Sequence, residues 1–297
     1  MTNQFGSQPF AFNKDLGAPV LATEKDFTQT NSQGQSVVPL TQEQKYLFDT
    51  QGWVVLPNLL EADELEAMTA FITQLHKEPQ SIPAYKRSPL GGPTQELADH
   101  PAILGFLNEF VYMPYTDGAN GPTLANENCY GYRLEMSAHR YVEAGPNDFG
   151  PHNGNGEMRL PGDQHLYRCF PGKANAGLVR VLWELAPVVK DRGGTLFISG
   201  SHKAAFRAPE SAWDPSSSLW ESYECPAGSA LIFTEGVTHS AATSWDADHP
   251  RISVLMSYNT VGGRWHHWDP DPQLVAEMPA KRQTLFRPIY TDNNFVV

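Results

Sequence analysis

The sequence predicts a mainly β domain with flanking helices and a core of the jelly-roll type. Three observations lead to this prediction: Gly and Pro number 24 each among 297 residues, aromatic residues make up 11%, and short apolar runs with turn signals between them fill the second half of the chain. Apolar residues total 40%, which is enough for a substantial core and excludes a globally disordered chain. No long helical pattern separates the strand-like runs, so a doubly wound parallel sheet is disfavoured.

The start of the domain shows a clear helix signal. Residues 1–40 are polar and are expected to form an extended N-terminal arm, with residues 41–297 forming a single domain. Thr41 has the character of a helix N-cap, and Gly52 suits the C-cap because glycine readily adopts a left-handed backbone. We therefore expect a helix between these two residues.

The remaining elements follow from hydrophobic periodicity. Apolar residues at helical spacing predict two further helices, at 59–76 and 99–112. Alternating or continuous apolar runs predict strands at 53–57, 130–136, 178–185, 194–198, 229–233 and 252–258.

Charge and cysteine content limit the possible partners. With 21 Lys and Arg against 33 Asp and Glu, the net charge is −12, which disfavours binding to nucleic acid and to anionic membranes. The three cysteines are widely separated and form no CxxC pair, which indicates a reduced, cytoplasmic location and no zinc ribbon. The N-terminus has no apolar core of the signal-peptide type, and no apolar run is long enough to span a bilayer. A small-molecule ligand is the partner that this composition allows.

One stretch near the C-terminus combines residue types that bind metals and carboxylates. The apolar run 228–233 leads to His239, and Arg251 opens the next strand twelve residues later, with Ser253 two places on. Alternate residues of a strand share a face, so Arg251 and Ser253 are expected to point into one pocket. A guanidinium and a hydroxyl together suit a carboxylate, while a neutral imidazole suits a metal. Taken singly, each of these residues is more often a surface or loop residue.

Two further motifs precede this stretch in the chain. The segment 191–203 reads DRGGTLFISGSHK, and the segment 48–57 reads FDTQGWVVLP. Together with the strand 228–233, His239 and Arg251, these segments resemble the phytanoyl-CoA dioxygenase-like family of Fe(II)/2-oxoglutarate oxygenases, over roughly residues 41–290. Each motif alone is loose, and it is their order and spacing that carry the resemblance.

The resemblance implies a double-stranded β-helix of the cupin type around an iron site with two His and one carboxylate ligand. On this basis His239 is the distal iron ligand, and Arg251 binds 2-oxoglutarate with Ser253 assisting it. His202 falls in the G-S-H turn and has no expected role at the metal. The implied activity uses O2 and 2-oxoglutarate to oxidise an unactivated C–H bond of a small molecule.

The other half of the expected iron site departs from the family pattern. His152 is the best candidate for the proximal ligand, but Gly154 stands where the family has a carboxylate. His165 is an alternative, and the corresponding position after it is Tyr167. We prefer His152 because its glycine-rich flanks allow a close approach to the metal.

Four interpretations of Gly154 remain open. In the halogenase branch of this superfamily, a small residue leaves room for chloride at the metal, so His152 and Gly154 could form a halide-accepting site. A distant carboxylate could instead complete a hydroxylase site, the candidates being Glu157, Asp148 and Asp163. Water could occupy the position. The fourth interpretation is a catalytically inactive jelly-roll binding protein.

Overall fold

The computed structural model describes residues 28–112, 127–152, 165–170 and 173–289, together with two short strands at 10–12 and 19–21. Five α-helices lie in these ranges: α1 (Gln42–Gln51), α2 (Ala62–Lys77), α3 (Pro101–Phe110), α4 (Pro272–Ala276) and α5 (Ala280–Gln283). The strands are β1 (Phe10–Phe12), β2 (Pro19–Leu21), β3 (Trp53–Leu56), β4 (Tyr132–Val142), β5 (Gly145–Pro146), β6 (Arg168–Phe170), β7 (Lys173–Asn175), β8 (Val179–Glu184), β9 (Thr195–Ile198), β10 (Ser229–Thr234), β11 (Thr238–Ala241), β12 (Ser244–Trp245) and β13 (Arg251–Thr260). None of the helices in the described ranges is long and apolar enough to cross a membrane.

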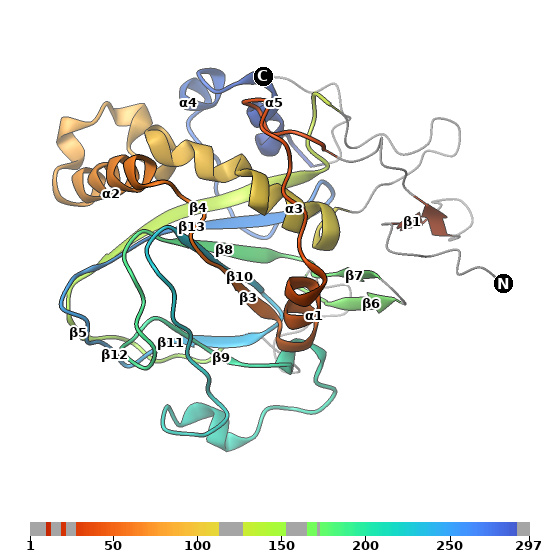
Figure 1. The fold of residues 1–297 in the computed structure, drawn as a ribbon, viewed down its shortest axis with the longest axis vertical. Helices are drawn as coiled ribbons and strands as arrows, with labels where there is room; N and C mark the ends of the chain where they lie inside the picture. The colour runs from red at the N-terminus through yellow and green to blue at the C-terminus, as the bar shows by residue number, and fades with distance from the viewer. Residues whose placement is uncertain are drawn as a thin grey trace.

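Two β layers face each other, which confirms the predicted jelly-roll fold. The major sheet is antiparallel with strand order β3-β10-β8-β13-β4. The second layer is built from the pairs β11-β9 and β12-β5. In Figure 1 helices α2 and α3 lie above the major sheet, and the second layer lies below it.

Each face of the major sheet has its own core. Trp183, Val254 and Ile232 point toward the helices and belong to a cluster that includes Ile72 of α2 and Leu107 of α3. The residues beside them in sequence point to the opposite face, where Leu182, Leu231, Phe233 and Leu255 pack with Phe197 and Trp245 of the second layer. The period-2 alternation of strands therefore separates a helix-covered core from the space between the two layers.

The predicted helix at 41–51 is confirmed in detail. Thr41 accepts a hydrogen bond from the backbone N–H of Gln44, and the Gln44 side chain accepts one from the Thr41 N–H, forming a capping box. At the other end, Gly52 has a φ of 86° and donates its N–H to the carbonyl of Phe48. The helix is attached to the core by Phe48, whose ring lies 4.7 Å from that of Phe106.

The second helix begins later than the periodicity indicates, at Ala62 instead of residue 59. The backbone N–H groups of Leu59 and Leu60 donate to the carbonyl of Gly228, at 2.9 and 3.3 Å. These bonds hold the segment against the end of the sheet, so the helix starts only after Glu61, which caps it together with Glu64.

Three of the four strands of the second layer, β5, β11 and β12, were not predicted from the sequence. β11 is polar and four residues long, while β5 and β12 have two residues each. Such segments carry no apolar alternation of their own, and they become strands because neighbouring chain supplies hydrogen-bonding partners. β9, which pairs with β11, lies within the predicted strand at 194–198.

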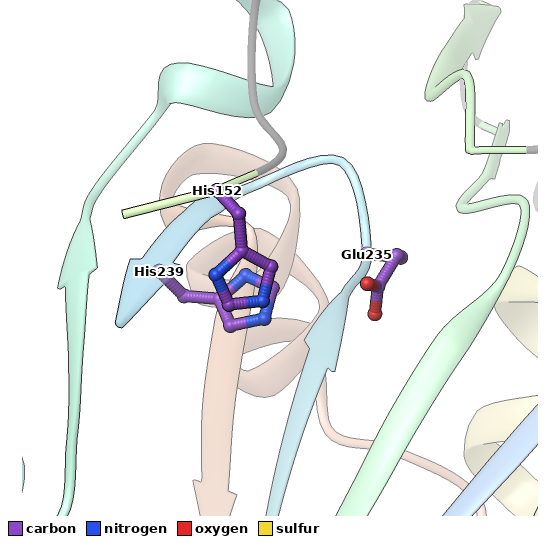
Figure 2. Close-up of side chains that lie close together, drawn as sticks. All are labelled: His152, Glu235 and His239. Atoms are coloured by element: carbon purple, nitrogen blue, oxygen red, sulfur yellow. The ribbon is translucent and has the colours of Figure 1, made fainter. Parts of the chain in front are cut away.

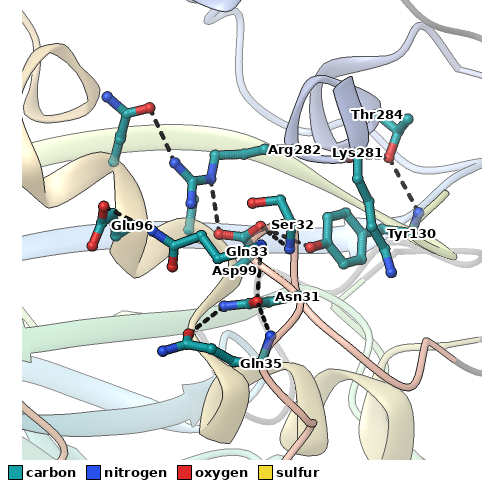
Figure 3. A network of polar contacts seen from close by, with 12 residues as sticks. Asn31, Ser32, Gln33, Gln35, Glu96, Asp99, Tyr130, Lys281, Arg282 and Thr284 are labelled. Carbon is teal, nitrogen blue, oxygen red and sulfur yellow. Dashed lines mark hydrogen bonds and ion pairs between the residues drawn. The ribbon is translucent and has the colours of Figure 1, made fainter. Parts of the chain in front are cut away.

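A buried ion pair joins segments that are distant in sequence (Figure 3). The Asp99 carboxylate accepts hydrogen bonds from Arg282 Nε at 2.8 Å, from the Tyr130 hydroxyl at 2.7 Å and from the backbone N–H of Ser32 at 3.2 Å. Asp99 is fully buried and Arg282 nearly so. Three partners satisfy this buried carboxylate, so the network fastens the chain before α1 and the chain at α5 to the entry of β4.

Replacing Gly52 with alanine should destabilise the fold by about 2 kcal/mol or more. The left-handed backbone disfavours any side chain, and a Cβ at this position would lie 2.6 Å from Nδ1 of the buried His202. Urea unfolding monitored by circular dichroism measures the loss.

Gly34→Ala is the matched control for that measurement. Gly34 has a φ of 80°, but no atom lies within 4 Å of the point that a Cβ would occupy there. The Gly34→Ala substitution introduces backbone strain but no side-chain clash. It should therefore lower the free energy of unfolding by only about 1 kcal/mol. An equal loss in both variants would show that contact with His202 is unimportant.

Candidate functional site

Two histidines lie side by side at the edge of the second layer. The backbone of His152 pairs with that of His239 through two mutual N–H···O bonds of 3.2 Å, so the residues face each other across an antiparallel bridge. Residues paired in this way project their side chains to the same face. The ring centroids are 4.2 Å apart. Strand pairing therefore brings together two imidazoles that are far apart in the sequence.

Backbone carbonyls orient both rings in the same way. His152 Nδ1 lies 2.8 Å from the carbonyl oxygen of Gly150, and His239 Nδ1 lies 2.8 Å from that of Val237. A carbonyl oxygen only accepts, so each Nδ1 carries a proton, and Nε2 is the nitrogen that a metal can bind. Metal-binding histidines are held in this way, with one nitrogen donating to the protein and the other directed at the metal.

His239 is kept neutral by its surroundings. The residue is 7% exposed, and the ring lies 4.8 Å from that of Phe233, centroid to centroid. Burial disfavours the charged imidazolium and lowers the pKa of His239 to about 4, although the nearby Glu235 opposes this effect. At neutral pH the ring is therefore in the form that can bind a metal.

A carboxylate completes a group of potential metal ligands. One oxygen of Glu235 and one nitrogen each of His152 and His239 all lie within 4.8 Å of one another. Figure 2 shows the two imidazoles together and Glu235 on the chain segment beside them. Two imidazole nitrogens and one carboxylate oxygen form a donor set that fits iron(II).

Glu235 is ionised although it is buried. Its Oε2 lies 2.5 Å from Nε of Arg180, whose Nη1 donates to the Ser257 hydroxyl at 2.6 Å. Burial alone would raise the pKa of Glu235, but the charge of Arg180 outweighs it and lowers the pKa to about 2. The carboxylate is thus a fixed negative charge next to the two rings.

Arg251 lies in the same pocket and is bound by other residues. Its Nη2 is 2.5 Å from Oε1 of Glu184 and 2.9 Å from the Tyr223 hydroxyl, and its Nε is 3.3 Å from Oε2 of Glu184. All three side chains are buried. The guanidinium is therefore held in one orientation, with its charge balanced by Glu184.

The two histidines and Arg251 share a pocket of about 130 Å³ between the two layers, whereas Glu235 and Glu184 do not line it. His152, His239 and Arg251 all line it, together with two further arginines, Arg140 and Arg180. The Arg140 guanidinium makes no hydrogen bond or ion pair within the part of the chain that the structure describes. The remaining walls are mostly apolar, and they are formed by Leu182, Thr195, Phe233, Ser240, Ala241 and Leu255.

This combination of a jelly roll, a paired histidine site and an arginine-rich pocket agrees with a match to a known family. Residues 48–253 match the model of the phytanoyl-CoA dioxygenase family. The chain belongs to this family. Comparison with curated protein sequences gives no match.

Solved structures show how widely this fold is shared. HygX from Streptomyces hygroscopicus, solved with iron bound, is similar with a TM-score of 0.58 and 20% identity, covering 86% of this chain and 98% of that one. EctD from S. alaskensis has a TM-score of 0.54 and 16% identity, covering 90% of each chain. SnoK, a carbocyclase from nogalamycin biosynthesis, has a TM-score of 0.51 and 16% identity, covering 85% of this chain and 94% of that one. At these identities the likeness shows the fold that the phytanoyl-CoA dioxygenase family shares with them.

Among the described residues, the other candidates from the sequence lie outside the ligand group or do not line the pocket. Ser253 is fully buried on the face that carries Arg251, but it does not line the pocket. Asp148 is exposed and lies outside the ligand group. His165 is buried with its ring 4.5 Å from that of Trp265, and it is not in the ligand group. Gly154, Glu157 and Asp163 lie outside the described residues.

His202 lies in the G-S-H turn and contacts the end of α1. Its Nε2 lies 3.1 Å from the carbonyl oxygen of Asp49, and its ring packs against Tyr167 with a centroid distance of 4.6 Å. Gly52 lies directly beside the ring. His202 therefore joins the G-S-H turn to the end of α1.

Three charged residues of the site, Arg180, Glu184 and Glu235, were not predicted from the sequence. A signal for the first two was present, because both interrupt the apolar strand β8 at positions that share one face with Leu182. Charged residues on one face of an otherwise buried strand indicate a polar pocket. Glu235 had no such signal, since it lies in the turn between β10 and β11.

Below pH 6.5 the metal-free protein should lose stability in part because of His239. The unfolded chain takes up a proton near the ordinary pKa of 6.5, whereas the folded ring resists protonation down to about pH 4. The stability that the neutral His239 ring contributes is thus fully present above pH 6.5. It is lost as the pH falls to 4, which lowers the free energy of unfolding by up to about 3 kcal/mol. His239→Gln should remove this part of the pH dependence, measured by urea unfolding with a chelator present.

An exposed imidazole provides the comparison for this experiment. His267→Gln is the same substitution at an exposed histidine that does not line the pocket, and it should keep the loss of stability that is attributed to His239. A His239→Gln variant with the parent slope would contradict the assignment.

Proposed function

We propose that this chain is an Fe(II)- and 2-oxoglutarate-dependent oxygenase that acts on a C–H bond of a small molecule, with His152 and His239 as iron ligands. The observation that carries the proposal is the paired imidazoles, whose Nδ1 atoms both contact backbone carbonyls in an arginine-lined pocket. Membership of the phytanoyl-CoA dioxygenase family supports the same chemistry. So does HygX, which has been solved with nickel and 2-oxoglutarate bound.

Arg251 and Arg140 are the proposed binding groups for the far carboxylate of 2-oxoglutarate. Glu184 and Tyr223 fix the Arg251 guanidinium from one side, so it is oriented before the co-substrate arrives. Arg140 adds a charge that no described carboxylate balances, which favours an anionic co-substrate. Ser253 of β13 pairs with Arg140 of β4 but does not line the pocket, so the two arginines alone are the proposed binding groups.

The pocket walls set the conditions for the reaction. Iron(II), 2-oxoglutarate and O2 together supply an oxidant strong enough to remove hydrogen from an unactivated carbon. Phe233, Leu182 and Leu255 form an apolar wall, which keeps water away from the reacting groups. The protein must also hold the target carbon close to the metal, since positioning decides which bond reacts.

Gly154 supports a second outcome of the same chemistry. A glycine two residues after His152 is the pattern that accepts chloride at the metal, so halogenation is the alternative to hydroxylation. The further alternative is a catalytically inactive protein that binds a ligand in this pocket and does not convert it.

Anaerobic addition of Fe(II) and 2-oxoglutarate should produce a weak visible charge-transfer band in the parent protein. His152→Ala and His239→Ala should each abolish the band, because each substitution removes one of the side chains proposed to bind the metal. Absorption spectroscopy under argon measures the band.

His267→Ala, at an exposed site, is the control and should retain the band. A parent protein without a band and without iron affinity would favour the inactive binding protein.

Removing either pocket arginine should weaken 2-oxoglutarate binding about 10- to 100-fold, since a charge-assisted hydrogen bond contributes about 1.5–3 kcal/mol. Arg140→Gln and the double variant Arg251→Gln/Glu184→Gln test this, the latter avoiding an unbalanced buried carboxylate. The dissociation constant follows from titrating the charge-transfer band with 2-oxoglutarate. Metal affinity without 2-oxoglutarate should stay at the parent level, and an unchanged co-substrate affinity in both variants would refute the assignment.

A further inference from the structure

We propose that Glu235 supplies the carboxylate ligand that Gly154 does not, so that three protein side chains, His152, His239 and Glu235, hold the metal. The inference rests on the proposed function, in which the two histidines bind iron. It places the acidic ligand four residues before the distal histidine, on the turn between β10 and β11, instead of two residues after the proximal histidine.

The first argument is geometric. No two of the three ligand atoms are more than 4.8 Å apart, and each comes from a different side chain of the group. Atoms bound to a common ion at about 2.1 Å lie about 3 Å from one another, so the side chains need to converge by less than about 2 Å. Glu235 and His239 belong to adjoining chain, and the strand bridge fixes His152 beside them. Small rotations of the side chains are enough to close the site.

The second argument is electrostatic. Three arginines, Arg140, Arg180 and Arg251, line the pocket, and both histidines would bind a metal as neutral rings. A dication there would meet a positive wall unless an anionic group lay next to it. Glu184 is already bound to Arg251 and Tyr223, whereas Glu235 is the carboxylate that lies in the ligand group.

Arg180 has a positioning role in this arrangement. It binds Oε2 of Glu235 and is itself held by the Ser257 hydroxyl. A carboxylate offers about four lone-pair positions on two oxygens, so contact with a guanidinium is compatible with metal coordination. Ligating carboxylates are commonly hydrogen-bonded to a second residue in this way, which sets their orientation.

The proposal selects between the two reaction types. With Glu235 as a ligand, the protein fills the position that a halide would occupy, and a negative charge already balances the metal there. The site then matches the two-histidine, one-carboxylate arrangement of oxygenases. We therefore expect hydroxylation-type oxidation from this site, although residue 154 is a glycine.

Titration of the full-length protein with Co(II), monitored through its visible bands, tests the ligand set without any turnover. Glu235→Gln should weaken Co(II) binding at least tenfold, because it removes the anionic oxygen while keeping an acceptor for Arg180. Excess chloride should shift the Co(II) spectrum of this variant and leave that of the parent unchanged. The parent titration needs no substitution, so a variant that fails to fold does not remove the test.

Two controls separate a ligand from a salt-bridge partner. Asp148→Asn removes an acidic residue that stands four places before His152, as Glu235 stands before His239, and should leave Co(II) affinity unchanged. Arg180→Gln should weaken Co(II) binding by less than Glu235→Gln does, because it removes a group that orients the carboxylate but keeps the carboxylate itself. Circular dichroism verifies that each variant is folded.

Three results would overturn the proposal: equal Co(II) affinity in the parent and in Glu235→Gln, a chloride-dependent spectrum in the parent, or an equal loss in Arg180→Gln and Glu235→Gln. The last result would make Glu235 a structural ion-pair partner. A parent protein that binds no Co(II) would instead refute the proposed iron site as a whole, so the two failures are distinguishable.

Discussion

The alternation of side chains across the major sheet is the constraint on which the other features of the structure depend. Along β8, the residues that face α2 and α3 are apolar and fill the helix-covered core, while the opposite face carries Arg180, Leu182 and Glu184. A single strand thus supplies part of a dry core and part of a charged pocket. Shifting its register by one residue would place both charges in the apolar core beneath the helices, so the buried charges also fix the pairing.

The pocket balances these charges in pairs. Arg180 lies against Glu235 and Arg251 against Glu184, and hydroxyl groups of Ser257 and Tyr223 take further hydrogen bonds. Buried ion pairs contribute little net stability, but they hold donors and acceptors in fixed directions. Here they fix an acidic group beside two imidazoles, while Arg140 forms no ion pair with a carboxylate among the described residues. The histidines and Glu235 are thus arranged to bind a metal, and the arginines are arranged to bind an anion.

The scaffold is shared with solved structures of low sequence identity, and likeness of fold does not specify the metal site. Similarity to HygX, EctD and SnoK at 16–20% identity reflects the common two-layer jelly roll. Within that scaffold the strand bridge between His152 and His239 fixes the relative position of the two histidines. The acidic partner is less constrained, since any turn near the rings can present a carboxylate. Replacement of the usual acidic residue by Gly154 therefore does not by itself determine the reaction type.

The jelly-roll class, the helix between Thr41 and Gly52, and the presence of His239 and Arg251 in the pocket could be predicted from the sequence. These features depend on local periodicity, on capping and on motif order, all of which can be read along the chain. That β11 is a strand, that Glu184 orients Arg251 and that Glu235 lies with the two histidines became apparent from the folded structure. Each of these depends on a contact between segments that are distant in sequence or on the direction of a turn, and neither the composition nor the spacing of residues specifies such a contact.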